Sequence, residues 1–90
     1  MMILAQNGQK IVSTDNLNYM QVEEKELNYK DYIYTITAFY THDHTILGEY
    51  KTAKRANEIL QDMYKQIMVQ NFSFTYEMPK EWEKWINKKR

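Results

Sequence analysis

The segment from Tyr32 to Thr41 restricts the fold of this chain more than any other part of the sequence. Its residues, Tyr-Ile-Tyr-Thr-Ile-Thr-Ala-Phe-Tyr-Thr, are almost all aromatic or β-branched. Side chains of these two kinds suit the pleated, half-buried surface of a β-sheet. We therefore predict that this segment is the longest strand of a sheet.

Shorter segments on either side of it have the patterns of further strands. Asn7-Gly8 separates two short apolar runs, and this dipeptide favours the tight turn of a hairpin. The stretch Asn18 to Glu24 alternates between apolar and polar residues, as a half-buried strand does. The polar segment 23–28 is predicted to be a loop, and His42-Asp43-His44 to be a turn. The predicted strands cover residues 3–5, 10–12, 18–24, 32–41 and 45–50, and Gly48 indicates a bulge or close packing in the last one.

A single long helix is predicted to follow the strands, from about Ala53 to Gln70. Thr52 precedes it and carries a hydroxyl that suits the N-cap position. Apolar residues then recur at spacings of three and four, which places them on one helix face. The residues of this stripe are Ala56, Ile59, Leu60, Met63 and Ile67.

The chain after this helix is rich in aromatic residues. Phe72 to Tyr76 alternates strictly and is predicted to be a short extended segment. Pro79 suits the first turn of a helix, so a last short helix is expected over 80–87. Trp82 and Trp85 would share one face of it with Ile86.

The order of these elements predicts an α+β fold: an antiparallel sheet of about five strands with one long helix packed on one face, plus a short C-terminal aromatic segment and helix. No Gly/Ser-rich or Pro-rich stretch divides the chain, so residues 1–90 are expected to form a single domain. Residues 1–50 would be mainly strands, residues 52–70 the helix, and residues 71–90 the aromatic extension and short helix.

Charge and composition exclude several classes of function. The 12 basic and 12 acidic residues cancel, whereas proteins that grip a phosphate backbone carry a basic excess, so a nucleic-acid partner is not expected. The chain has no cysteine and therefore no disulfide, thiolate nucleophile or cysteine zinc site. The first residues are too few in apolar side chains for a membrane span and lack the basic start of a signal peptide. A cytoplasmic location without a membrane partner is therefore expected.

The motifs of the chain predict no catalytic residue, cofactor or metal. Gly8 and Gly48 are the only glycines, and neither lies in a phosphate-binding loop or a nucleophile elbow. His42 and His44 could point the same way at a strand end, but a zinc site needs three or four ligands, and the sequence indicates no third one. The chain is expected not to be an enzyme.

The aromatic residues carry the main functional signal, because 8 tyrosines, 3 phenylalanines and 2 tryptophans are many for 90 residues. Alternation along the strand 32–41 places Tyr34, Ile36, Ala38 and Tyr40 on a face that a helix could cover. The opposite face holds Ile33, Thr35, Thr37 and Phe39, and it is apolar enough to predict that a second copy of the chain or a ligand covers it. In the alternative, the C-terminal aromatic extension folds back over it. The predicted binding residues are Tyr32, Phe39, Tyr40, His42, His44, Trp82 and Trp85.

Two stretches of the sequence carry a resemblance. They are Met2 to Asn18, with Asn7-Gly8 and Asp15-Asn16, and Leu47-Gly48-Glu49-Tyr50-Lys51-Thr52, followed by Ala56 and Leu60. In these positions, over about residues 2–70, the chain resembles a loose group of small uncharacterised proteins from phages and mobile elements of Firmicutes. The resemblance implies a shared fold rather than a chemistry, because the residues are turn, bulge, cap and core positions. It also implies a setting, since phage accessory proteins of this size often act against host defences.

The expected function is therefore that of a non-enzymatic phage or mobile-element binding protein, a homo-oligomer in the host cytoplasm, that antagonises host defence. In one mechanism it sequesters a nucleotide-derived signal, with Tyr or Trp rings stacked on a base and His42, His44 or a lysine near the phosphate. In the alternative it inhibits a host defence protein through its aromatic face and the Trp82/Trp85 helix. A structural or regulatory accessory role without a part in defence is a further alternative.

Overall fold

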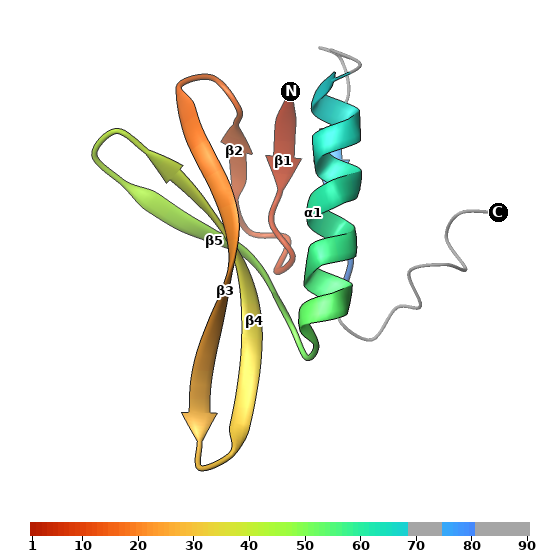
Figure 1. The fold of residues 1–90 in the computed structure, drawn as a ribbon. Helices are drawn as coiled ribbons and strands as arrows, with labels where there is room; N and C mark the ends of the chain where they lie inside the picture. The colour runs from red at the N-terminus through yellow and green to blue at the C-terminus, as the bar shows by residue number, and fades with distance from the viewer. Residues whose placement is uncertain (69–74, 81–90) are drawn as a thin grey trace, which may run out of the picture.

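The computed structural model of the chain describes residues 1–68 and 75–80 (Figure 1). These residues form β1 (Met2–Leu4), β2 (Ile11–Ser13), β3 (Leu17–Asn28), β4 (Asp31–Tyr40), β5 (His44–Tyr50), α1 (Ala53–Met68) and β6 (Thr75–Glu77). The fold is α+β, as the order of strands and helix predicts. The last short helix predicted over 80–87 lies outside the described residues.

The strands form two three-stranded sheets, with the orders β2-β1-β6 and β3-β4-β5, rather than one sheet of about five strands. In the first sheet Ile3 pairs with Val12 of antiparallel β2 and with Tyr76 of parallel β6. The expectation of a single sheet was wrong because an alternating pattern predicts a strand but does not specify which strand pairs with it. Here β1 takes its second neighbour from the far end of the described chain.

The Asn7-Gly8 hairpin is confirmed. The Ala5 amide donates to the Lys10 carbonyl at 2.8 Å, and the Gly8 amide donates to the Ala5 carbonyl at 2.9 Å. Gly8 has a φ of 74°, a value that side-chain-bearing residues rarely adopt. The Asn7 side chain accepts from the Gln9 amide at 2.9 Å, so the turn is closed by local contacts.

The polar segment 23–28, expected to be a loop, is instead the second half of β3. Glu23 pairs with Thr35 of β4, and Asn28 pairs with Asp31 at the end of the hairpin. Pairing with the strongest strand of the chain supplies a ladder of backbone hydrogen bonds, and this tertiary gain outweighs the low strand propensity of Glu and Lys. Beyond Tyr34, the last β4 residue that pairs with β5, the two strands continue as an arm formed by residues 25–33, which extends past the N-terminal end of α1 (Figure 1).

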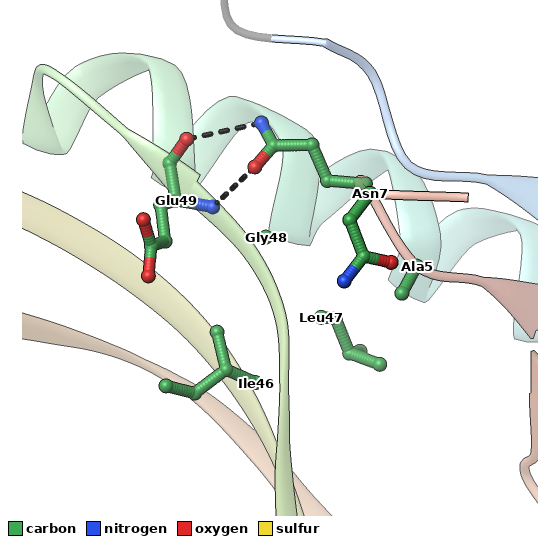
Figure 2. A pocket seen from close by; sticks show the side chains of 7 residues that line it. Ala5, Asn7, Ile46, Leu47, Gly48 and Glu49 are labelled. Atoms are coloured by element: carbon green, nitrogen blue, oxygen red, sulfur yellow. Dashed lines mark hydrogen bonds between the residues drawn. The ribbon is translucent and has the colours of Figure 1, made fainter. Parts of the chain in front are cut away.

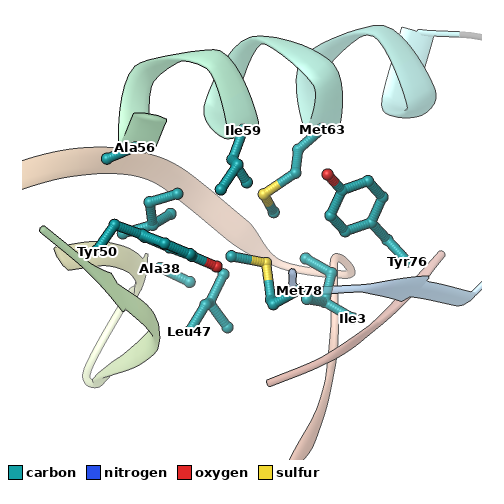
Figure 3. Packing of buried hydrophobic residues seen from close by; sticks show 10 residues of the cluster. Ile3, Ala38, Leu47, Tyr50, Ala56, Ile59, Met63, Tyr76 and Met78 are labelled. Atoms are coloured by element: carbon teal, nitrogen blue, oxygen red, sulfur yellow. The ribbon is translucent and has the colours of Figure 1, made fainter. Parts of the chain in front are cut away.

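Helix α1 covers the core, and its predicted N-cap and apolar stripe are largely confirmed. The Thr52 hydroxyl accepts from the Arg55 amide at 3.1 Å. Ala56, Ile59 and Met63 are fully buried, whereas Leu60 packs at the margin. Figure 3 shows these helix residues facing side chains from both sheets, so one helix closes a core that the two sheets share. The contributions of the sheets and of the segment after β6 are Ile3, Ile36, Ala38, Leu47, Tyr50, Tyr76 and Met78.

Gly48 lies at a bulge in β5, as its position inside a strand predicts. Ile36 of β4 pairs with Gly48 and Thr37 pairs with Ile46, so Leu47 is the extra residue. The bulge turns Leu47 into the core, where it is 1% exposed. Within residues 1–68 and 75–80, no helix is long and apolar enough to cross a membrane.

Candidate binding face

Helix α1 and the first sheet lie on the same side of the β3-β4-β5 sheet (Figure 1). Ile36 and Ala38 of β4 point to that side and are fully buried, as their alternation predicts. The opposite side, here called the open face, carries the side chains that alternate with them. The strand register places these residues in rows that run across the sheet. The rows are Tyr19–Phe39–His44, Gln21–Thr37–Ile46 and Glu23–Thr35–Glu49.

The first of these, here called the aromatic row, is a stack of three rings. The rings of Tyr19 and Phe39 have centroids 4.6 Å apart with planes at 16°, and those of Phe39 and His44 are 5.7 Å apart at 25°. Cross-strand neighbours stand close enough for such stacking, which stabilises the pair beyond the area it buries. Because Tyr19 is 52% exposed, the stack presents aromatic surface in a fixed geometry.

The row Glu23–Thr35–Glu49, here called the acidic row, places two carboxylates on either side of a threonine. The Glu23 carboxylate accepts from the Thr37 hydroxyl at 3.0 Å and from the Gln21 amide at 3.1 Å. These donors orient it, while Glu49 on the edge strand is exposed. This end of the open face is therefore rich in negative charge, although Lys25 follows Glu23 on the same side of β3.

The middle of the open face is polar rather than apolar. Thr35 and Thr37 are 3% and 1% exposed, and their hydroxyls lie 3.4 Å apart. Thr35 and Thr37 are therefore packed between the side chains of β3 and β5 that flank them. Ile46 beside them is 39% exposed and extends the apolar surface of the aromatic row.

The structure brings only some of the predicted binding residues to this face. Phe39 and His44 stand next to each other in the aromatic row. Tyr40 points to the other side, where its hydroxyl donates to the Ser13 carbonyl at 2.7 Å and burial raises its pKa. Tyr32 lies on the arm and His42 on the exposed β4–β5 turn. Trp82 and Trp85 lie outside the described residues.

Sequence reasoning missed Tyr19, Glu23, Ile46 and Glu49 as parts of this face. The alternation of β3 does place Tyr19 and Glu23 on one side of their own strand. The alternation does not specify the register between strands. The register places Tyr19 beside Phe39 and places Glu23 and Glu49 on either side of Thr35.

A small pocket of about 260 Å³ lies between the β1–β2 turn and β5 (Figure 2). The Gln6 side chain borders it and pairs with the backbone of Glu49, donating to its carbonyl at 3.0 Å and accepting from its amide at 2.9 Å. The side-chain amide of Gln6 thus makes the backbone hydrogen bonds at the β5 edge that a neighbouring strand would make. Because ligand sites usually have about 300–1,000 Å³, we interpret the pocket as a seam between the two sheets.

Within the described part of the chain, no three His, Asp or Glu side chains are grouped so that they could hold a metal ion. His44 instead stacks on Phe39.

No protein-family model, curated protein or solved structure matches the chain.

Proposed function

We propose that this chain is a non-enzymatic binding protein that binds a partner protein through its open face. The observation that carries the proposal is the aromatic row standing beside the acidic row on one sheet. Aromatic side chains held in place by their neighbours lose little entropy on binding, and such residues are the usual hot spots of protein interfaces. Carboxylates at the margin of such a surface favour a partner with basic side chains.

Sequestration of a nucleotide-derived signal is the second candidate, and the aromatic row is what supports it. A base could extend the ring stack beyond Tyr19 or His44. However, the phosphates of a nucleotide would approach a face that carries Glu23 and Glu49, which is electrostatically unfavourable. The open face therefore favours a protein partner over a nucleotide.

The proposed setting is the cytoplasm of a host cell, with a host defence protein as the partner. Support for this setting comes from the resemblance to small phage and mobile-element proteins. In this setting the chain would antagonise its partner by occupying one of the partner's surfaces, which needs no catalytic group.

The proposal is tested with the purified chain and two variants of the same kind. Phe39→Ala removes the central ring of the aromatic row, and Tyr29→Ala removes an 82% exposed ring at the arm tip as a matched control. Proteins retained from a Firmicutes lysate by the wild type are identified, purified and titrated by calorimetry. We expect Phe39→Ala to weaken the binding of a true partner about 30-fold, the loss that corresponds to about 2 kcal/mol, and Tyr29→Ala to leave it unchanged.

Equal affinities of the two variants would contradict the proposal. Native mass spectrometry of the wild type tests whether a nucleotide is bound instead. A nucleotide that leaves the protein on denaturation would favour the second candidate.

A further inference from the structure

Strand β3 lies at one edge of the β3-β4-β5 sheet, and within residues 1–68 and 75–80 its outer side has no strand neighbour. The strand is 12 residues long, and none of its residues is fully buried. An unpaired edge strand presents a row of backbone N–H and C=O groups that can pair with a strand of another chain. Several classes of protein bind an extended peptide in this way, as one more strand of a sheet.

The hydrogen bonds of β5 show which backbone groups of β3 point to this free edge. Glu49 uses both its N–H and its C=O for the Gln6 side chain at the outer side of β5. Thr35, which is paired with Glu49, therefore directs both of its groups to the other side, toward Glu23 of β3. The direction alternates along an antiparallel strand. The residues of β3 that direct their backbone groups to the free edge therefore include Met20, Val22 and Glu24.

The aromatic row and the acidic row of the open face both end at this edge. Tyr19 is the last ring of one row and Glu23 the last carboxylate of the other, and the two are four residues apart on β3. A strand added at the edge would place one side chain opposite each of them, with Cβ atoms about 4.5–5.5 Å apart. An aromatic ring opposite Tyr19 would continue the stack. A lysine or arginine opposite Glu23 would pair with its carboxylate.

The residues between these two that point to the other side of β3 favour apolar neighbours. Met20 and Val22 are half-buried and pack against the core. Apolar side chains opposite them would extend the core across the edge. The complementary segment therefore has an aromatic residue at one end, a basic residue four positions away, and apolar residues beside each of these two.

A second copy of β3 does not match this pattern. In a two-fold antiparallel pair of β3 strands, the register that sets Glu23 opposite Lys25 also sets Glu24 opposite Glu24 of the second copy. Like charges directly opposite each other destabilise a sheet. The register that sets the two Tyr19 rings opposite each other leaves Glu23 beyond the start of the second strand. A different chain can match both rows in one register.

We propose that the partner protein adds an antiparallel fourth strand at the free edge of β3, through an extended segment with a basic and an aromatic residue four positions apart. The inference rests on the proposed function, because it names the kind of segment that the open face recognises. The added strand continues the aromatic row and the acidic row. It also forms backbone hydrogen bonds with the residues of β3 that face the edge.

Synthetic peptides and the full chain test the strand addition. The peptide Ser-Lys-Val-Thr-Ile-Tyr-Ser carries the pattern in the antiparallel direction, and we expect it to bind. The reversed peptide has the same composition but would set its tyrosine opposite Glu23, so it should bind more weakly. N-methylation of the valine or the isoleucine, whose amides would face β3, should abolish binding. N-methylation of the central threonine, whose amide would face away, should leave the affinity unchanged.

Amide hydrogen exchange, followed for each residue by NMR, locates the bound peptide. In the free chain the Val22 amide should exchange faster than the Glu23 amide, because Glu23 is bonded to β4. Saturation with the first peptide should slow exchange at Met20 and Val22 by about tenfold or more. Exchange at Gln21 and Glu23 should not change.

Variants of the chain test the two rows. Tyr19→Ala and Glu23→Gln should each weaken the binding of the first peptide about 2–5-fold, as the loss of a cross-strand pair does. Tyr29→Ala and Glu58→Gln change exposed residues of the arm and of α1, so these matched controls should keep the wild-type affinity. Far-UV circular dichroism of every variant verifies that the fold is intact.

Three results would overturn the strand addition: no saturable binding of the first peptide up to about 1 mM, equal binding of the reversed peptide, or Met20 and Val22 amides that are already protected in the free chain. The last would show that another segment or a second copy occupies the edge. The proposed function is tested separately with Phe39→Ala. A natural partner that Phe39→Ala weakens, but that leaves exchange at Met20 and Val22 unchanged, would support the proposed function and refute the strand addition.

Discussion

Gly48 lies directly under the ring of Tyr50, and this contact leaves no room for a side chain. A Cβ atom at Gly48 would lie 2.7 Å from the Tyr50 hydroxyl oxygen and 2.9 Å from its Cε2. The ring cannot move aside cheaply because it is buried and its hydroxyl donates to the Pro79 carbonyl at 2.8 Å. We expect Gly48→Ala to lower the free energy of unfolding by about 1–3 kcal/mol, as overpacking of a core does. Urea denaturation measures this loss.

The same substitution in a Tyr50→Phe background is the control for this steric explanation. Phenylalanine lacks the hydroxyl that makes the shortest contact, so Gly48→Ala should cost less in that background than in the wild type. An equal cost in both backgrounds would mean that the two residues do not interact and that the loss has another origin.

At the scale of a single element, α1 is predicted to depend on its fully buried positions. Ile59 is completely buried against the sheets, whereas Leu60 lies at the margin of the core. Truncation at a buried position removes apolar contacts and leaves a cavity, so Ile59→Ala should cost about 2–5 kcal/mol. Leu60→Ala should cost clearly less, because water can fill the space. If urea denaturation showed the larger loss for Leu60→Ala, the orientation of the helix would be wrong.

For the molecule as a whole, the contact of β6 with α1 predicts sensitivity to alkaline pH. Tyr76 donates to the Asp62 carboxylate at 3.0 Å, and burial, together with the charge of Asp62, raises the pKa of Tyr76 well above the ordinary 10.0. The folded state then keeps a proton that the unfolded state releases above pH 10, so stability is full below that pH and falls as pH rises beyond it. Tyr76→Phe should lose less stability than the wild type between pH 8 and pH 11, roughly the range over which a free phenol titrates. Parallel curves in urea denaturation would contradict this account.

The homo-oligomer expected from the sequence stays a prediction, and the structure offers two surfaces for it. One is the open face around Phe39, and the other is the arm, where Leu27, Tyr29 and Tyr32 are exposed. Because two acidic rows do not complement each other, we expect the arm to be the contact. Light scattering over a dilution series should then show dissociation for Tyr32→Asp and not for Phe39→Asp. A wild type that remains monomeric at high concentration would refute self-association.

The sequence by itself determined the features that depend on residues close together along the chain. The alternation of Tyr32 to Thr41 predicts both the strand and its buried side, because successive side chains of any strand point to opposite faces. Asn7-Gly8 predicts a turn because these residues tolerate the backbone conformation that a tight hairpin requires. Thr52 predicts the start of α1 because its hydroxyl can accept a hydrogen bond from the amide of Arg55 in the first turn. Each of these signals acts over a few residues, so no knowledge of the rest of the molecule is needed.

Only the tertiary structure decided which strands are neighbours and which side chains meet. Residues 24–28 are a strand because β4 pairs with them. The second neighbour of β1 is β6, which comes after α1 in the sequence, and not β3. The open face depends on register in the same way. The bulge at Leu47 shifts β5 by one residue, and a shift of one residue exchanges the two faces of a strand. Without that shift, β5 would not present both His44 and Glu49 on the face that carries Phe39 and Glu23, because residues of opposite parity point to opposite sides of a regular strand.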